Sequence, residues 1–389
     1  MELQMKYQYT YFIYPYVIEK KNYNNYITTL TNNKKCEIST WKKEKNLNLY
    51  NFFLPETRKY IFNDFKNIEN NLKKEENTIL FNYKLEEDIQ GKVVNEGGIF
   101  FQIQRIHILC FKSGLCFLIF KTNVENSKIF SDILNFNYKF RDINSEQGLL
   151  KEYENIKIQS DKFENMKKLT EFITEITNNA GNDNKIDTNR FYTYSYVCIE
   201  KESWNAENLE NEFIKYSNIL PSSYNINSST ENKEISTNSK YCKIGVTDYG
   251  VTLLCSSEDN KNYTTLLEIY ENEYLYLYLI SLYEKLYSKL IMLNIKNNQK
   301  HAKTEYVKFK KQLVSNNITN DEYGNTLYSE FRKTLKLNEI SEEITKIFDI
   351  ECKKLDIEKT RKANKIILVI LFASLTLNII NFITLMYYR

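Results

Sequence analysis

The stretch IILVILFASLTLNIINFITLMYY occupies residues 366–388 and contains 23 residues without a charge. At a helical rise of about 1.5 Å per residue it is roughly 34 Å long, enough to cross a hydrocarbon layer about 30 Å thick. A single segment can cross only as a helix, because a lone strand would leave its amide groups without hydrogen-bond partners in lipid. The sequence therefore predicts one transmembrane helix at 366–388 and a lipid bilayer as a partner.

Basic residues flank this run mainly on one side. Six Lys or Arg residues lie between positions 353 and 365, whereas Arg389 alone follows the run. Because basic flanks stay in the cytoplasm, we expect a single-pass protein of the cell membrane with its N-terminal head in the cytoplasm. We expect no signal peptide, since MELQMKYQYTYF lacks a basic region and a cleavage site. The other interpretations of the run are a buried core helix and a cleaved tail.

The composition favours a folded chain without a cofactor. The 53 Lys and Arg residues nearly balance 50 Asp and Glu residues, and 42% of the chain is hydrophobic. This even balance argues against nucleic acid as a partner. The seven cysteines form no CxxC pair and no spacing suited to zinc. We therefore expect free, buried thiols in a reducing cytosol and no metal site.

The chain repeats one order of predicted elements. Residues 7–20 (YQYTYFIYPYVIEK) are similar to residues 190–201 (RFYTYSYVCIEK), and both are aromatic runs typical of buried strands. Residues 105–121 parallel residues 241–257, because each range holds two apolar runs that meet at a turn with glycine. A helix is predicted after each first strand and after each hairpin. This order indicates a duplicated unit, and chance similarity in a Tyr- and Ile-rich chain is the alternative.

The predicted fold class is α+β: an α/β cytoplasmic head, duplicated in this interpretation, with a long C-terminal stalk helix and one transmembrane helix. The polar connector NNAGNDNKIDTN at 178–189 marks the boundary between the halves. The expected domains are a first α+β half at 1–177, a second half at 190–300, a helical stalk at 301–365 and the transmembrane helix at 366–388.

The predicted stalk has a regular apolar stripe. An Asn-rich break at 316–325 allows the chain to reverse, and no Pro or Gly occurs in the last 65 residues. One helix from about Leu337 to the C-terminus would be roughly 80 Å long. Such a helix has no neighbour to cover its stripe unless it meets other copies of itself. The sequence therefore predicts a homo-oligomer with stalk contacts at Ile340, Ile344 and Ile347.

A polar seam is predicted inside the membrane segment. Ser374, Asn378 and Asn381 share one helical face with Leu371 and Leu385, at alternating three- and four-residue spacing that ends at Tyr388. Asn is costly against lipid and less so against another helix or water. We expect Ser374, Asn378 and Asn381 to face partner helices or a pore. The alternative is that the two Asn residues reflect the composition of the chain alone.

No catalytic motif is recognisable, so we do not expect an enzyme. The sequence lacks the GxxxxGK[ST], GxGxxG, GxSxG and HExxH patterns. Of the two histidines, His107 is expected in the core of an apolar strand and His301 on a basic helix. The NEGG run at 95–98 is interpreted as a plain turn and the acidic run at 86–88 as a solvated loop. The ligand-binding residues stay unknown at this point.

The layout of most of the chain resembles that of the CorA family of divalent-cation channels: a two-part α/β head, several helices, a long stalk helix and a C-terminal membrane segment. The two spans and the Gly-Met-Asn signature of that family are missing, since Met386 has no Gly before it and no Asn after it. The layout is more similar to the divergent CorA-like membrane proteins that accompany type III CRISPR systems. That resemblance implies a cytoplasmic sensor of a nucleotide second messenger that perturbs the membrane in antiviral defence.

Three functions are therefore compatible with the sequence. The first is an oligomeric, membrane-anchored sensor and effector that responds to a cytoplasmic, nucleotide-type ligand. The second is a divalent metal cation channel or transporter, which would conduct without a signal. The third is a non-conducting scaffold, in which the membrane helix only tethers a protein-binding head.

Overall fold

The computed structural model describes residues 2–39, 46–61, 78–85, 89–93, 98–143, 156–159, 167–178, 186, 189–227, 230–235, 237, 239–258, 266–297, 302–313 and 317–387. The strands are β1 (Met5–Val17), β2 (Cys36–Ile38), β3 (Ile79–Tyr83), β4 (Ile89–Val93), β5 (Phe100–Cys110), β6 (Leu115–Val124), β7 (Ile156–Gln159), β8 (Lys167–Lys168), β9 (Tyr192–Ile199), β10 (Glu234–Ile235), β11 (Cys242–Thr247) and β12 (Gly250–Ser256). The helices are η1 (Lys20–Asn22), α1 (Tyr23–Asn32), α2 (Leu47–Phe52), α3 (Pro55–Ile61), α5 (Phe130–Arg141), α6 (Leu169–Ile176), α7 (Lys201–Trp204), α8 (Leu209–Ser217), the π-helical turn η2 (Tyr270–Tyr274), α10 (Leu275–Lys296), α11 (Ala302–Leu313), α12 (Glu322–Thr334) and α13 (Leu337–Tyr387).

The two aromatic runs of the sequence form neighbouring strands of one mixed sheet. The strand order is β10-β11-β12-β9-β1-β6-β5-β4-β7-β8, and β3 also pairs with β5 and carries β2. β1 pairs antiparallel with β9 from Met5 to Ile13 and with β6 from Thr10 to Val17. The two predicted halves therefore share one continuous sheet and do not form separate cores.

Both predicted hairpins are present, but their strands do not run in the same direction relative to the first strand. β6 lies antiparallel to β1, whereas β12 lies parallel to β9. The halves thus share the order of their elements and differ in topology, so the duplication stays a prediction from the sequence. The connector at 178–189 lies largely outside the described residues, as do the NEGG run up to residue 97 and the acidic run at 86–88.

The turn glycines act in two different ways. Gly114 has φ +91°, and a Cβ there would lie 2.2 Å from the carbonyl oxygen of Ile18. Gly250 is not among the positive-φ residues; a Cβ there would instead lie 2.6 Å from the carbonyl oxygen of Thr193. Gly114 is therefore needed for its positive φ, whereas Gly250 is needed because two backbones approach closely.

Alternate side chains of β1 and β9 belong to two separate apolar layers on opposite faces of the sheet. One layer lies between the sheet and α10, α12 and the start of α13, and it contains Tyr9 and Tyr196 with stacked rings 5.2 Å apart. The other lies between the opposite face and α1, α5, α6 and α8, and it contains Phe12 stacked on Phe140 at 4.0 Å. Because both faces are covered, the strands are apolar on both sides.

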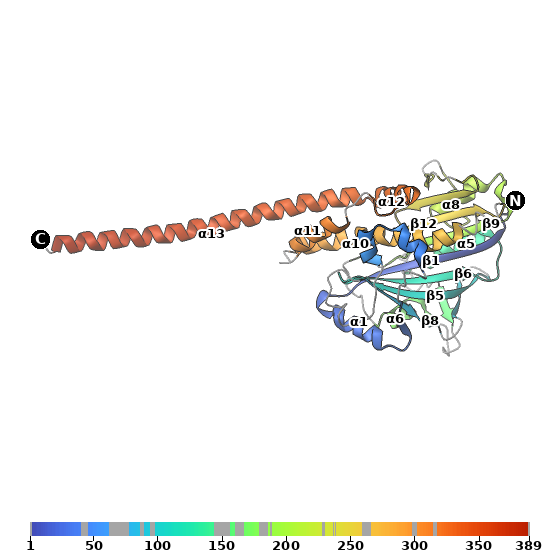
Figure 1. Cartoon of the computed structure of the whole chain (residues 1–389), viewed down its shortest axis with the longest axis horizontal. Coiled ribbons are helices and arrows are strands. Elements are labelled where there is room, and N and C mark those ends of the chain that lie inside the picture. The colour runs from blue at the N-terminus through green and yellow to red at the C-terminus, as the bar shows by residue number, and fades with distance from the viewer. Residues whose placement is uncertain are drawn as a thin grey trace.

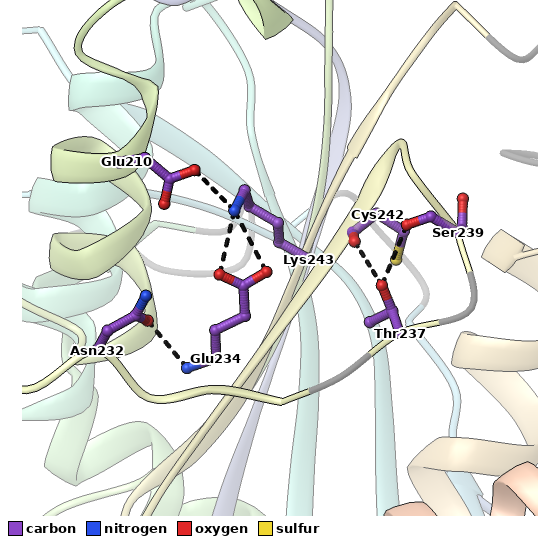
Figure 2. A network of polar contacts seen from close by, with 7 residues as sticks. All are labelled: Glu210, Asn232, Glu234, Thr237, Ser239, Cys242 and Lys243. Atoms are coloured by element: carbon purple, nitrogen blue, oxygen red, sulfur yellow. Dashed lines mark hydrogen bonds and ion pairs between the residues drawn. The ribbon is translucent and has the colours of Figure 1, made fainter.

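Ion pairs join β10, at the edge of the sheet, to β11 and α8. Figure 2 shows the amino group of Lys243 on β11 between Glu234 of β10 and Glu210 of α8. The Nζ–Oε distances are 2.8 Å to Glu210 and 3.1 Å to Glu234. The Thr237 hydroxyl donates to the Cys242 carbonyl at 2.8 Å in the same view. These contacts fasten a two-residue edge strand to its neighbours and cover that edge.

The helices after the sheet begin as part of the head. Phe331 of α12 is fully buried, and Ile344 of α13 is 1% exposed within the same apolar layer. Ile340 and Ile347 pack against that layer as well. The head of the same chain therefore buries Ile344 and covers part of Ile340 and Ile347, and their role as oligomer contacts stays a prediction from the sequence.

Beyond Phe348 the helix α13 leaves the head and runs alone to the C-terminus (Figure 1). Its C-terminal part is exposed along its whole length and is long and apolar enough to cross a membrane. Lys336, between α12 and α13, has φ +56°. That left-handed residue ends α12 and turns the chain into α13.

Candidate functional site

A cavity of about 240 Å³ lies between the sheet and the η2–α10 segment. Its walls come from β1, β3, β5, β6, η2 and α10, and from the residues around α2 and after β2. The polar residues that line it are Ser39, Asn46, Asn82, Arg105, His107, Glu271 and Asn272. Leucine side chains and Tyr276 supply the apolar part of the wall, so the cavity suits a small molecule that is partly polar.

A β-bulge in β5 turns two polar side chains toward this cavity. The register between β5 and β6 shifts between Ile103 and Arg105. Before the shift, Ile103 belongs to the apolar layer under α5 and α6, and after it Ile106 belongs to that layer. The bulge therefore changes the alternation, so that Arg105, His107 and Leu109 line the cavity on the helix side.

The opposite wall is irregular too. Residues Tyr270–Tyr274 form a π-helical turn at the start of α10. This turn carries Glu271, whose carboxylate accepts a hydrogen bond from the Tyr11 hydroxyl at 2.9 Å. Lys121 of β6 forms an ion pair with the same carboxylate, and Arg105 lies 3.7 Å from it. π-helical turns often occur at functional sites, and here one meets a bulge across a cavity.

Lys121 is held in an enclosed position. Its side chain is 6% exposed, and its ammonium lies 4.7 Å from the ring centre of Tyr9. Burial lowers the pKa of Lys121, although the ion pair with Glu271 opposes that shift. Burial also raises the pKa of Tyr11 well above its usual value, and the Glu271 charge adds to the effect. Tyr11 is therefore a neutral donor and Lys121 a fixed cation.

The sequence predicted that His107 lies in the core of an apolar strand. In the structure, His107 also lines the cavity. Its Nδ1 lies 2.8 Å from Oδ1 of Asn82, its register partner on β3. Because Oδ1 is an acceptor, Nδ1 carries the proton and Nε2 is an acceptor. Burial, with Arg105 and Lys121 nearby, lowers the pKa of His107 to about 4. The imidazole is therefore neutral at cellular pH.

These groups together favour a ligand with an anionic end. Arg105 and Lys121 carry two positive charges against one negative charge on Glu271, so these three side chains have a formal charge of +1. The Arg105 side chain is 62% exposed, whereas those of Lys121 and Glu271 are largely enclosed by comparison. An incoming anion would meet Arg105 at the rim, while neutral His107 and the Asn amides could hydrogen-bond a polar ring. Over the described part of the chain, no group of three His, Cys, Asp or Glu side chains is placed to hold a metal ion.

The residues singled out from the sequence lie elsewhere. Ser374, Asn378 and Asn381 are on the exposed part of α13, and the Ser374 hydroxyl donates to the Leu371 carbonyl of its own helix at 2.9 Å. Ile340, Ile344 and Ile347 lie at the base of α13 against the head. His301 and Tyr388 are outside the described residues. One chain therefore does not bring the seam and the cavity together; the packed helices α10, α11, α12 and α13 lie between them.

Comparison of the chain with family models, with curated proteins and with solved structures gives no match.

Proposed function

We propose that the protein is a membrane-anchored, oligomeric sensor and effector. Its head would bind a small nucleotide-type ligand from the cytoplasm in the cavity, and α13 would carry the response into the cell membrane. One observation carries this proposal: the η2–α10 segment provides Glu271 to the cavity and also packs against α12 and α13, the elements that lead to the membrane segment.

The route from the cavity to the membrane is short and continuous. Glu284, three helical turns beyond the cavity residue Glu271, accepts a hydrogen bond from Tyr328 of α12 at 2.9 Å and forms an ion pair with Arg332. Arg332 in turn donates to Asn338 at the start of α13 at 3.0 Å. A ligand that shifts Glu271 would therefore act on the start of a continuous helical segment whose middle, at Glu284, contacts the elements at the base of α13.

The basic flank supports the proposed topology. With residues 366–388 in the bilayer, the cluster of Lys and Arg between 353 and 365 would lie at the cytoplasmic headgroups. The exposed helix between residue 349 and residue 365 would hold the head roughly 25 Å from the membrane. This layout is the one that resembles the CorA-like membrane proteins, and antiviral membrane perturbation is the corresponding biological role in our proposal.

The ligand site is tested by binding to the full-length protein in detergent. We expect one member of a panel of mono-, di- and cyclic nucleotides to raise the melting temperature. Arg105→Ala should weaken that binding roughly 10- to 100-fold, because a hydrogen bond to a charged group contributes about 1.5–3 kcal/mol. Isothermal titration calorimetry gives the affinity of both proteins.

Lys359→Ala is the control, because Lys359 carries the same charge and is exposed on α13 far from the cavity. It should leave the affinity unchanged. If no nucleotide binds, or if Arg105→Ala binds as tightly as the natural protein, the assignment of the cavity as a nucleotide site is wrong.

The membrane seam separates an effector from a tether. Replacing Asn378 and Asn381 together by Leu should leave membrane insertion intact. An Asn amide that faces lipid costs about 1–3 kcal/mol, and the replacement removes this cost. Ligand-triggered leakage of a dye from proteoliposomes should nevertheless fall, since the polar face of the assembly is lost. Thr376→Leu is the matched control on the opposite side of the helix, where the Thr hydroxyl already bonds to the Ala373 carbonyl at 2.8 Å. Equal leakage by the double variant and the natural protein would favour the scaffold function.

A further inference from the structure

The part of α13 between the head and the membrane segment has two exposed isoleucines. Ile350 is 53% exposed and Ile357 is 64% exposed. Full burial of an Ile side chain is favourable by roughly 2 kcal/mol or more, so exposure at these positions is unfavourable. Both come after Phe348, the last apolar side chain of α13, among those the structure describes, that packs against the head. Packing within the single chain therefore does not explain why these two positions carry isoleucine.

These isoleucines belong to a longer series with a strict seven-residue repeat. The series, which we call the heptad line, consists of Ile350, Ile357, Asn364, Leu371, Asn378 and Leu385. A straight α-helix has 3.6 residues per turn, so a strict repeat of seven stays on one face only in a left-handed supercoil. The heptad line continues the predicted membrane seam toward the head without a change of register.

The residues beside the heptad line carry complementary charges. With the line at position a of the heptad, Asp349 and Asp356 occupy position g, and Lys354 and Arg361 occupy position e. In a parallel, in-register pair of helices, position g of one copy meets position e of the next heptad of the other copy. The expected pairs are Asp349 with Lys354 and Asp356 with Arg361. An antiparallel arrangement would bring like charges together.

We propose that the heptad line is the interface between copies of this chain, aligned in parallel and in register from below the head into the membrane. This inference depends on the membrane insertion in the proposed function, because a common anchor makes all copies point the same way. The line also gives Asn378 a polar partner on the neighbouring copy. A single polar residue at such a core position is known to fix register. The partner is therefore a second copy of the chain, and the contact lies beyond Ile347.

Cysteine cross-linking in proteoliposomes tests the position of the interface. The background variant is Cys352→Ser, since the other six cysteines are buried and Cys352 is half-buried. Ile357→Cys should form disulfide-linked dimers on mild oxidation with copper phenanthroline. Lys359→Cys, about 200° away around the helix, should form at least several-fold fewer. Both positions are exposed, so neither change should disturb the head.

Charge exchange tests the alignment. Asp356→Arg should reduce the cross-linking yield of Ile357→Cys several-fold, and adding Arg361→Asp should restore it. Equal yields at 357 and 359, or a double variant that stays as weak as the single one, would overturn the inference. Nucleotide binding measured on the same samples separates the two proposals. Intact binding without cross-linking overturns only the interface, whereas recovery of the protein outside the vesicles overturns the common anchor as well.

Discussion

Removal of residues 366–389 is expected to move the protein from the membrane fraction to the soluble fraction. Of the 23 residues in the uncharged run, 14 are Ile, Leu, Phe or Val. At roughly 0.3–0.6 kcal/mol each, they favour insertion by about 4–8 kcal/mol before the polar residues are counted. Every 1.4 kcal/mol changes the partition tenfold, so the shift should exceed a hundredfold.

The truncated head should stay folded, because none of the side chains that the structure describes at 366–387 lies in either apolar layer. Flotation of a lysate on a density gradient distinguishes membrane association from aggregation, and circular dichroism checks the fold. Ile350→Ser with Ile357→Ser is the matched control, since it makes α13 less apolar and keeps the anchor; it should still float. A truncated protein that floats with lipid would show that another segment binds the membrane.

Local patterns in the sequence predicted the elements of this fold better than their arrangement. The uncharged run, the two aromatic strands and both hairpins are local, because they depend on neighbouring residues. The pairing of β1 with β9 joins residues 179 to 194 positions apart, and no local pattern specifies it. For the same reason the sequence predicted the apolar stripe around Ile344 but not that this stripe packs against the head of its own chain.

The cavity was harder to find from the sequence. Three of its lining residues, Tyr11, Arg105 and Glu271, come from three separate elements, and Lys121, which pairs with Glu271, comes from a fourth. A local sign is that Arg105 and His107 lie two residues apart in a strand that also contains Gln102 and Gln104. In a regular strand, Arg105 and His107 would lie on the same face as Ile103. The bulge that turns them toward the helices on the other face is visible only in three dimensions. The π-helical turn at Glu271 gives no sequence signal that we can name.

A buried ion pair connects the head to the base of α13. Glu284 of α10 and Arg332 of α12 have side chains that are 5% and 9% exposed. Burial raises the pKa of the Glu284 carboxyl, while the Arg332 charge opposes that shift. The Tyr328 hydroxyl donates to the other carboxylate oxygen, so the carboxylate is well satisfied as long as Arg332 is present. The pair adds little net stability by itself but leaves a costly charge if one partner is lost.

Arg332→Met should therefore lower the free energy of unfolding by about 3–5 kcal/mol, since it leaves the Glu284 carboxylate buried without its counter-ion. For a chain of this size we expect the melting temperature to fall by roughly 6 °C or more, at about 2 °C per kcal/mol. Differential scanning calorimetry of the full-length protein in detergent measures the fall. Lys333→Ala is the control, because Lys333 is 79% exposed and its contact with Glu330 is 3.8 Å long; a surface pair of this kind should change the stability very little.

The double variant Glu284→Leu with Arg332→Met distinguishes stability from signal transfer. Replacing both partners removes the uncompensated charge, so the melting temperature should return close to that of the natural protein. The hydrogen bond from Arg332 to Asn338 is lost all the same, and with it the polar link between α12 and α13. If that link passes the state of the cavity to the membrane, the double variant should bind nucleotide normally and yet release less dye on binding. A double variant that is stable and leaks as the natural protein does would show that apolar packing of α10 against α13 transmits the signal without the ion pair.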